Sequence, residues 1–367
     1  MSTQVAAPPA AAPQVAPARQ QPRLYVPLIL ILTTVMAWAL TLNNGIFIDE
    51  SVYIRSGRAI IENWLNGTEL PPWVGQGFSG HPTLYPVLAG ALDMVGGLAL
   101  VRLFSLGCIV ATMLLLRSIA NEIFNRRAGL ITAAIFGLTG PVLYVAHLGT
   151  FDALVILLLV TAWWVGMRDG LGMTVLFGAL LGLAVATKYT AYVFVPPLLV
   201  LSLFRPYGLS HSSELRTWLR PRVPWKRVRH AVIAGLIAVD TALLVYITAN
   251  ETTREALMFT TIGRDALSPV PRGYLVGTVP NFVWPTFFAA VLGLIWLYRA
   301  RRWNAVLWGV VLLGTALLLP VAQIKLGEGV SFQKHLAYSA AFLAPLAGGA
   351  SPVRGSSRSG RRCCAGG

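Results

Sequence analysis

Long apolar segments separated by short polar ones dominate this chain. The segments are about 14 to 20 residues long, close to the roughly 20 residues of helix that cross a bilayer, and they predict membrane helices. The ten predicted spans are residues 24–42, 101–118, 128–147, 151–167, 171–187, 189–204, 231–249, 281–298, 304–322 and 336–349. The pattern therefore predicts an all-α polytopic membrane protein, a bundle of about ten transmembrane helices.

A mixed segment, residues 43–100, separates the first two spans. Residues 51–65 combine helical spacing of apolar side chains with charges, which is typical of a helix that lies on the membrane surface. Residues 71–73, Pro-Pro-Trp, end that helix. Residues 87–100 are apolar but short and contain a Gly-Gly pair, and they predict a surface or re-entrant helix. The segment is thus a long first loop with juxtamembrane helices.

Both ends of the chain lack an apolar pattern. Residues 1–23 are rich in Ala, Pro and Gln and predict a disordered tail. A cleaved signal peptide would have a shorter apolar core and a small-residue cleavage site, so residues 24–42 are interpreted as an uncleaved anchor. Residues 24–350 form one predicted transmembrane domain. Residues 351–367 predict a disordered basic tail, and the abrupt change there suggests a C-terminal truncation or a change of reading frame.

Composition and charge agree with membrane insertion. Apolar residues make up 56% of the chain and charged residues 12%, against about 25% charged residues in soluble domains. A net charge of +15 would also suit a nucleic-acid partner. However, 20 of the 29 lysines and arginines fall on one side of the predicted spans and nine on the other. Such a bias sets orientation, so we predict a cytoplasmic N-terminus and no nucleic-acid partner.

Carboxylates gather on the predicted extracytoplasmic side. Asp49 and Glu50 follow the first span directly, and Asp152 holds an equivalent place at the start of span 151–167. A charge at the edge of an apolar span is costly unless it is paired or used, so a functional site is the default hypothesis. The alternatives are a solvated acidic loop for the first pair and a helix N-cap for Asp152.

Cations lie on the same predicted side as these carboxylates. They are Lys188, Arg264 and Lys334, and Tyr338 follows Lys334 by about one helical turn. Positive charge at a lipid interface beside carboxylates suits a lipid phosphate as ligand. The alternative for Lys188 is a side chain that reaches toward the outer headgroups. His81 also lies on this side, with a structural role as its alternative.

Cofactor motifs are absent from the sequence. The three cysteines and five histidines show no ligand spacing, and there is no Asp-x-Asp pair and no nucleotide-binding loop. We therefore predict no cofactor, while a metal requirement stays open.

A series of short motifs resembles the GT-C glycosyltransferases, most closely family 39, which includes protein O-mannosyltransferases and aminoarabinose transferases. The resemblance covers about residues 24–350. It rests on Phe47-Ile48-Asp49-Glu50-Ser51-Val52-Tyr53 with Arg58, His81-Pro82, Val101-Arg102-Leu103-Phe104-Ser105, Arg126-Arg127-Ala128-Gly129-Leu130, Phe151-Asp152-Ala153 and Gly182-Leu183-Ala184-Val185-Ala186-Thr187-Lys188.

The resemblance implies a sugar donor carried on a polyprenyl phosphate and a plasma-membrane enzyme whose site faces away from the cytoplasm. It implies Asp49 as catalytic carboxylate and Asp152 as a second acidic residue. It also implies phosphate contacts from Lys188, Arg264 and the segment 334–338. Glu50, Tyr53 and Arg58 are expected to orient the loop or a substrate. One departure is His81, where aminoarabinose transferases carry a lysine, and this argues against a lipid A acceptor.

The expected chemistry fits these residue types. Sugar transfer passes through an oxocarbenium-like state, and a positioned carboxylate takes the proton of the acceptor hydroxyl. The phosphate leaving group needs fixed positive charge, for which Arg264 and Lys334 are candidates. We predict a glycosyltransferase that uses Asp49 as the base and has membrane lipid as a partner. The sequence does not identify the acceptor. The rival hypotheses are a transporter or lipid flippase, which would show internal repeats, and an inactive paralogue.

Overall fold

The computed structural model describes residues 25–41, 45–75, 78–203, 225–261, 266, 269–301 and 303–349. Both predicted tails and Arg264 lie outside these residues. The described chain is helical, with one isolated bridge between Pro269 and Glu328. Its elements are α1 (Tyr25–Thr41), α2 (Ile48–Asn66), α3 (Tyr85–Ile123), α4 (Arg126–Leu138), α5 (Gly140–Ala146), α6 (Phe151–Gly166), α7 (Leu171–Thr187), the 3₁₀ helix η1 (Tyr189–Phe194), α8 (Val195–Leu203), α10 (Trp225–Thr248), α11 (Glu251–Thr261), α12 (Arg272–Arg299), α13 (Trp303–Leu326) and α14 (Phe332–Gly349).

The all-α prediction is confirmed, but the number of full-length crossings is smaller than predicted. Within the described residues, α3, α10, α12 and α13 are long and apolar enough to span a bilayer. The helices α4 and α5 add a fifth span if this pair, bent by 67°, is counted as one. The remaining predicted spans are shorter helices. Breaks that the apolar pattern conceals, such as Thr139 and the 3₁₀ segment before Pro196, divide these runs.

The predicted helix 87–100 corresponds to the first part of α3, which a break at Gly96 and Gly97 separates from the rest of that element. Gly96 and Gly97 interrupt the helical backbone there, and Gly97 has φ 66° and ψ −171°. Only glycine adopts that conformation readily, because it has no Cβ. The Gly-Gly pair therefore divides α3 into two helical parts, one before Gly96 and one after Gly97.

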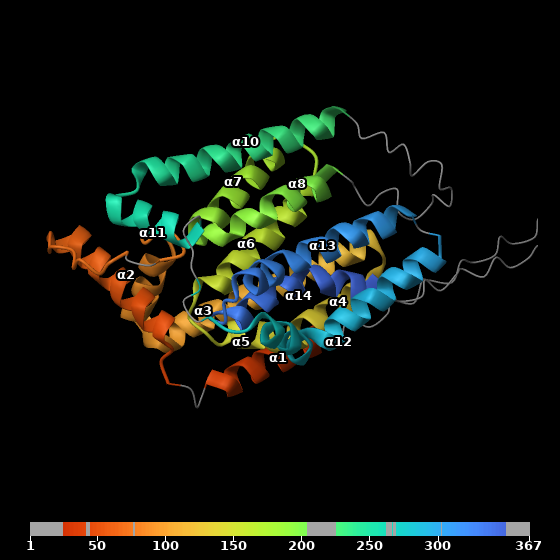
Figure 1. Cartoon of the computed structure of the whole chain (residues 1–367), viewed down its shortest axis with the longest axis horizontal. Helices are drawn as coiled ribbons and strands as arrows, with labels where there is room; N and C mark the ends of the chain where they lie inside the picture. The colour runs from red at the N-terminus through yellow and green to blue at the C-terminus, as the bar shows by residue number, and fades with distance from the viewer. Residues whose placement is uncertain are drawn as a thin grey trace, which may run out of the picture.

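Helix α14 lies at the centre of the bundle (Figure 1), in contact with α3, α4, α5, α6, α12 and α13. Every residue from Lys334 to Gly349 is buried. Small side chains permit this packing: a Cβ on Gly348 would lie 2.3 Å from Thr132 Oγ1, and one on Gly293 of α12 would lie 2.1 Å from the Leu346 carbonyl oxygen. Because α14 is enclosed, any polar side chain at its N-terminal end must find its partners inside the protein.

Helix α2 confirms the predicted surface helix at residues 51–65 and extends it to Ile48–Asn66. Its outer side exposes large apolar side chains, among them Ile48, Trp64 and Leu65. Its inner side packs very closely on α3, since a Cβ on Gly57 would lie 1.8 Å from the carbonyl oxygen of Pro86. This close contact fixes the first turn of α2, which carries Asp49 and Glu50.

Candidate functional site

The carboxylate of Glu50 is fully buried and joins three segments of the chain. It accepts hydrogen bonds from Arg102 Nε (2.8 Å) and Nη2 (2.7 Å), from the Gly149 amide (2.6 Å) and from the Phe47 amide (2.8 Å). Arg102 also donates to the Gly45 carbonyl oxygen at 2.8 Å. Glu50 thereby connects the start of α2 to α3 and to the α5–α6 connection.

Burial alone would raise the pKa of Glu50. The hydrogen bonds from Arg102, Gly149 and Phe47, together with the charge of Arg102, outweigh burial and lower the pKa below its ordinary value. Glu50 is thus held ionised and fully occupied, which suits a residue that orients its neighbours rather than one that exchanges protons.

Asp49 directly precedes Glu50 in the first turn of α2. Its carboxylate forms an ion pair with the ammonium of Lys334, from the first turn of α14. The Asp49 side chain is 31% exposed, whereas that of Lys334 is 5% exposed. Lys334 also lies over the ring of Phe47, with Nζ 5.2 Å from the ring centre. The pair therefore presents an accessible carboxylate on a buried cation.

Asp152 lies at the start of α6 and is completely buried. It accepts hydrogen bonds from Lys188 Nζ (2.5 Å), Tyr338 OH (3.0 Å) and Thr150 Oγ1 (3.2 Å). Lys188 follows α7 directly and is itself buried, so it does not reach toward headgroups. Its Nζ lies 2.8 Å from His335 Nε2, and because an ammonium can only donate, this imidazole nitrogen accepts.

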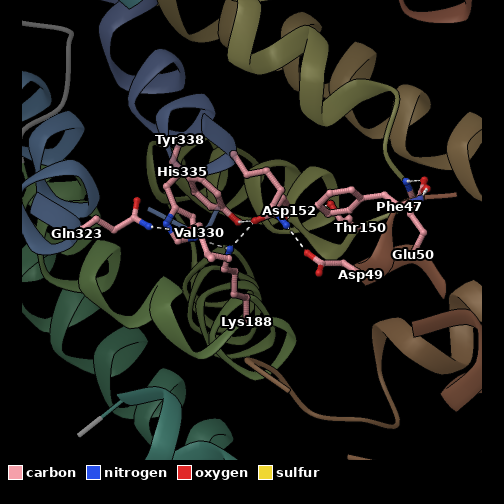
Figure 2. Close-up of polar contacts among 12 residues, drawn as sticks. Phe47, Asp49, Glu50, Thr150, Asp152, Lys188, Gln323, Val330, His335 and Tyr338 are labelled. Atoms are coloured by element: carbon pink, nitrogen blue, oxygen red, sulfur yellow. Dashed lines mark hydrogen bonds and ion pairs between the residues drawn. The ribbon is translucent and has the colours of Figure 1, made fainter. Parts of the chain in front are cut away.

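The first turns of α14 join the two carboxylates. Lys334 contacts Asp49. Figure 2 shows the adjacent His335 in contact with Lys188, and Tyr338 in contact with Asp152. Residues far apart in the sequence thus converge on one end of the central helix. The predicted carboxylates Asp49 and Asp152 are therefore brought together with three of the predicted binding residues. These three are Lys188, Lys334 and Tyr338.

Tyr53 contributes an aromatic wall beneath these groups. Its ring packs against those of Phe78, Tyr85 and Phe151 at centroid distances of 5.6, 5.7 and 4.9 Å. Phe151 in turn lies under Lys188, whose Nζ is 4.9 Å from the ring centre. Tyr53 is buried, and its ring packs against the residue that precedes Asp152.

Arg58 and His81 lie outside this network. Arg58 forms an ion pair with Asp93 of α3 and its side chain is 47% exposed. His81 Nδ1 lies 2.7 Å from Thr83 Oγ1, and burial lowers the His81 pKa. In the part of the chain described, neither residue hydrogen-bonds Asp49 or Asp152. Their substrate-binding roles stay predictions.

The sequence assigned no site role to Arg102, which appeared only within the motif 101–105, or to His335. An arginine within a long apolar segment was the available signal for Arg102, since such a charge requires a partner. His335 is adjacent to Lys334 in the sequence, but its contact with Lys188 depends on the packing of α14 against α7's end. No group of three or more His, Cys, Asp or Glu side chains in the described residues is placed to hold a metal ion.

An apolar groove of about 420 Å³ lies between α12, α13 and α14. Its lining includes Val283, Phe287, Leu317 and Pro320, with Leu336 and Leu343 of α14. Leu336 and Leu343 point to the other side of α14 from Lys334, because residues two apart on a helix are turned by about 200°. Pro280 and Pro285 of α12 and Pro320 of α13 lack the amide hydrogen of a regular helix.

The comparisons with known proteins place this arrangement in a recognised architecture. Residues 81–237 match the family model described as dolichyl-phosphate-mannose-protein mannosyltransferase. The structure of ArnT from Cupriavidus metallidurans bound to undecaprenyl phosphate superposes with a TM-score of 0.61 at 20% identity, over 89% of this chain and 60% of that one. The apo form of the same protein gives 0.58 at 18% identity, over 89% and 59%.

The chain has the GT-C fold.

A second GT-C structure, the oligosaccharyltransferase of Archaeoglobus fulgidus in its apo form, matches with a TM-score of 0.53 at 14% identity, over 88% of this chain and 50% of that one. No curated protein matches the chain by sequence. The chain spans about three fifths of the length of ArnT and half that of the oligosaccharyltransferase. The prediction of a multi-pass GT-C membrane protein is confirmed.

Proposed function

We propose that this protein is a glycosyltransferase that moves a sugar from a polyprenyl-phosphate donor to an acceptor hydroxyl, with Asp49 as general base. The observation that carries the proposal is the Asp49–Lys334 ion pair, which combines a partly exposed carboxylate with a buried cation. The fold supports it, since the GT-C architecture is one of lipid-linked sugar transfer.

Asp49 suits the base because it is the more exposed of the two paired carboxylates. An acceptor hydroxyl within hydrogen-bond distance would lose its proton to Asp49 as the sugar bond forms. Protonation of Asp49 releases the Lys334 ammonium from its ion pair. The ammonium can then stabilise the phosphate oxygen that gains negative charge as the donor bond breaks. Arg264 is proposed for the same task; it lies outside the described residues.

Asp152 is proposed to hold cations in place rather than to take a proton. All its partners are donors from buried side chains, and Lys188 and Tyr338 both bond to the same oxygen atom, Oδ1. This arrangement fixes the ammonium of Lys188 beside α14, where it adds positive potential for a phosphate. Glu50 and Tyr53 are proposed to orient Asp49 and Phe151.

The donor class is proposed from the structural neighbours and from the apolar groove. ArnT has been solved with undecaprenyl phosphate, and the archaeal oligosaccharyltransferase AglB with a dolichol phosphate. In this chain, the apolar groove between α12, α13 and α14 suits an isoprenoid tail. The acceptor is proposed to be a hydroxyl of a protein, lipid or cell-envelope glycan.

The proposed location is the plasma membrane, with the N-terminus in the cytoplasm and the site on the other side. The bias of 20 lysines and arginines against nine supports this orientation. The site lies at the end of the bundle where the less basic connections meet.

The test is transfer of label from a radiolabelled polyprenyl-phosphate sugar, with mannose and aminoarabinose donors assayed separately on purified protein. Asp49→Asn removes the base while keeping the side chain's shape, and is expected to lower transfer at least 100-fold. Glu69→Gln, at an exposed acid on the same side, is the matched control and should leave transfer unchanged. Full activity of Asp49→Asn would rule out the proposed base.

A further inference from the structure

The buried ammonium of Lys188 lies between two acceptors from different helices. Its Nζ is 2.5 Å from Asp152 Oδ1 of α6 and 2.8 Å from His335 Nε2 of α14. Both acceptor residues are themselves buried. Lys188 therefore connects the start of α6 to the first turn of α14, at the end of the bundle that carries the site (Figure 2).

The two acceptors act differently on the charge of Lys188. Asp152 is a carboxylate, so it opposes the positive charge of the ammonium as well as orienting it. His335 accepts through the lone pair of Nε2, and an imidazole nitrogen that accepts a hydrogen bond carries no proton of its own. The contact with His335 therefore directs the ammonium without cancelling its charge.

Two aromatic rings also lie beside Lys188. Nζ is 4.9 Å from the ring centre of Phe151 and 5.3 Å from that of Tyr338. Cation–π attraction, like the hydrogen bond to His335, holds a cation and leaves its charge in place. The first turns of α14 thus hold Lys188 through His335 and Tyr338, while the neighbouring Lys334 pairs with Asp49.

We propose that His335 is a positioning residue for the donor phosphate, because it holds the Lys188 ammonium where that charge acts on the phosphate of a polyprenyl donor. The inference rests on the proposed function, in which Lys188 supplies positive potential. A charge fixed in advance stabilises an anion without reorganisation as the ligand arrives. Without the imidazole, Lys188 keeps its pair with Asp152 but loses the acceptor that orients it from α14.

Binding of undecaprenyl phosphate to the full chain in detergent tests this role, with the dissociation constant as the readout. His335→Leu removes the acceptor and should weaken binding about tenfold, the effect of one hydrogen bond to a charged group. His335→Gln is the matched control, because its carbonyl oxygen is an acceptor at a similar distance from the backbone, and it should stay within about threefold of the original. Unchanged binding in His335→Leu, or equally weak binding in His335→Gln, would overturn the proposal.

A second background shows whether His335 acts through Lys188. Asp152→Asn and Lys188→Met together remove both charges of the ion pair, so that neither is left buried alone. In this background His335→Leu should change the dissociation constant less than about twofold, because the group that it positions is gone. A tenfold effect that persists there would refute the positioning role.

Transfer of label separates this inference from the proposed function. If the original chain transfers the sugar and His335→Leu equals it in both kcat/KM and binding, the inference alone fails. If the original chain binds undecaprenyl phosphate as expected but transfers no label, the transferase function fails and the positioning role stands. Absence of binding by the original chain would overturn both. A lower melting temperature of His335→Leu with unchanged binding would show that the contact is structural only.

Discussion

At the scale of residues, Asp49 and Glu50 are neighbours in the sequence with opposite environments. Glu50 is enclosed and saturated by four donors, while Asp49 has one cation and an accessible side. Adjacent positions on a helix point about 100° apart, so a single turn can send one carboxylate into the protein and leave the next at the surface. The buried acid builds the site and the accessible one is available for chemistry.

Removal of the Glu50 partner should destabilise the protein strongly. Arg102→Met leaves a buried carboxylate without its cation, a change that typically costs about 3 to 5 kcal/mol. Arg58→Met removes the partner of Asp93 in a half-exposed pair and should cost about 1 kcal/mol or less. Melting temperatures of the two variants in the same detergent make the comparison. An equal fall in melting temperature in the two variants would show that the Glu50–Arg102 pair contributes no more to stability than the Arg58–Asp93 pair.

The same pair makes stability dependent on pH. Since the pKa of Glu50 is lower in the folded protein than in the unfolded chain, the stabilisation is complete above about pH 4.3. It should decline as the pH falls below that value, toward the pKa of the folded state. Arg102→Met is expected to show a smaller decline over this range in a thermal-unfolding series, because it has already lost the main contact.

At the scale of elements, α14 carries most of the site on its first turns and is buried along the rest of its length. Its sequence is rich in alanine and glycine, and neighbouring helices approach its backbone directly at Gly293 and Gly348. Close packing of this kind transmits any displacement of the helix to its end. The positions of Lys334, His335 and Tyr338 therefore depend on contacts several turns away.

A matched pair of glycine substitutions measures this packing. Gly293→Ala places a Cβ 2.1 Å from the Leu346 carbonyl oxygen and should cost about 1 to 3 kcal/mol. Gly314→Ala of α13 meets no atom within 4 Å and should gain up to about 1 kcal/mol from helix propensity. Unfolding temperatures of the two variants report the difference. A higher unfolding temperature in both variants would show that α12 and α14 can move apart at Gly293 without a loss of stability.

At the scale of the whole molecule, the chain carries both an apolar groove, between α12, α13 and α14, and a charged pair, Asp49 and Lys334. Such a division matches a ligand that is itself divided into a charged head and a long apolar tail. The groove opens along α12, whose Trp284 and Phe288 side chains are exposed where lipid would surround the bundle. A lipid donor could enter from the bilayer without leaving the apolar phase.

Filling the groove should separate tail binding from chemistry. Leu317→Trp introduces a bulky ring into the groove and is expected to raise the KM for a long-chain polyprenyl donor about tenfold or more, with little change in kcat. Val310→Trp, exposed on the same helix, is the control and should leave KM unchanged. An unaltered KM in Leu317→Trp would exclude the groove as the site of the tail.

Much of this architecture could be predicted from the apolar pattern, because eight of the ten predicted spans each fall on one apolar helix. The division of spans 128–147 and 189–204 into two helices each could not, since the breaks at Thr139 and in η1 lie inside otherwise apolar segments. The grouping of Asp49, Asp152 and Lys188 on one side followed from counting charges. Their actual partners did not, because Glu50–Arg102 and Lys188–His335 are contacts between segments 52 and 147 residues apart.

The central position of α14 also has a consequence for biosynthesis. Asp152 is made about 180 residues before Lys334, which at roughly 5 to 20 residues per second is a delay of about 10 to 40 s. During that interval the carboxylates from earlier helices are already in the membrane without the side chains of α14. The earlier helices must therefore leave the central position open until α14 is made. We expect activity to begin only after α14 has packed between its neighbours.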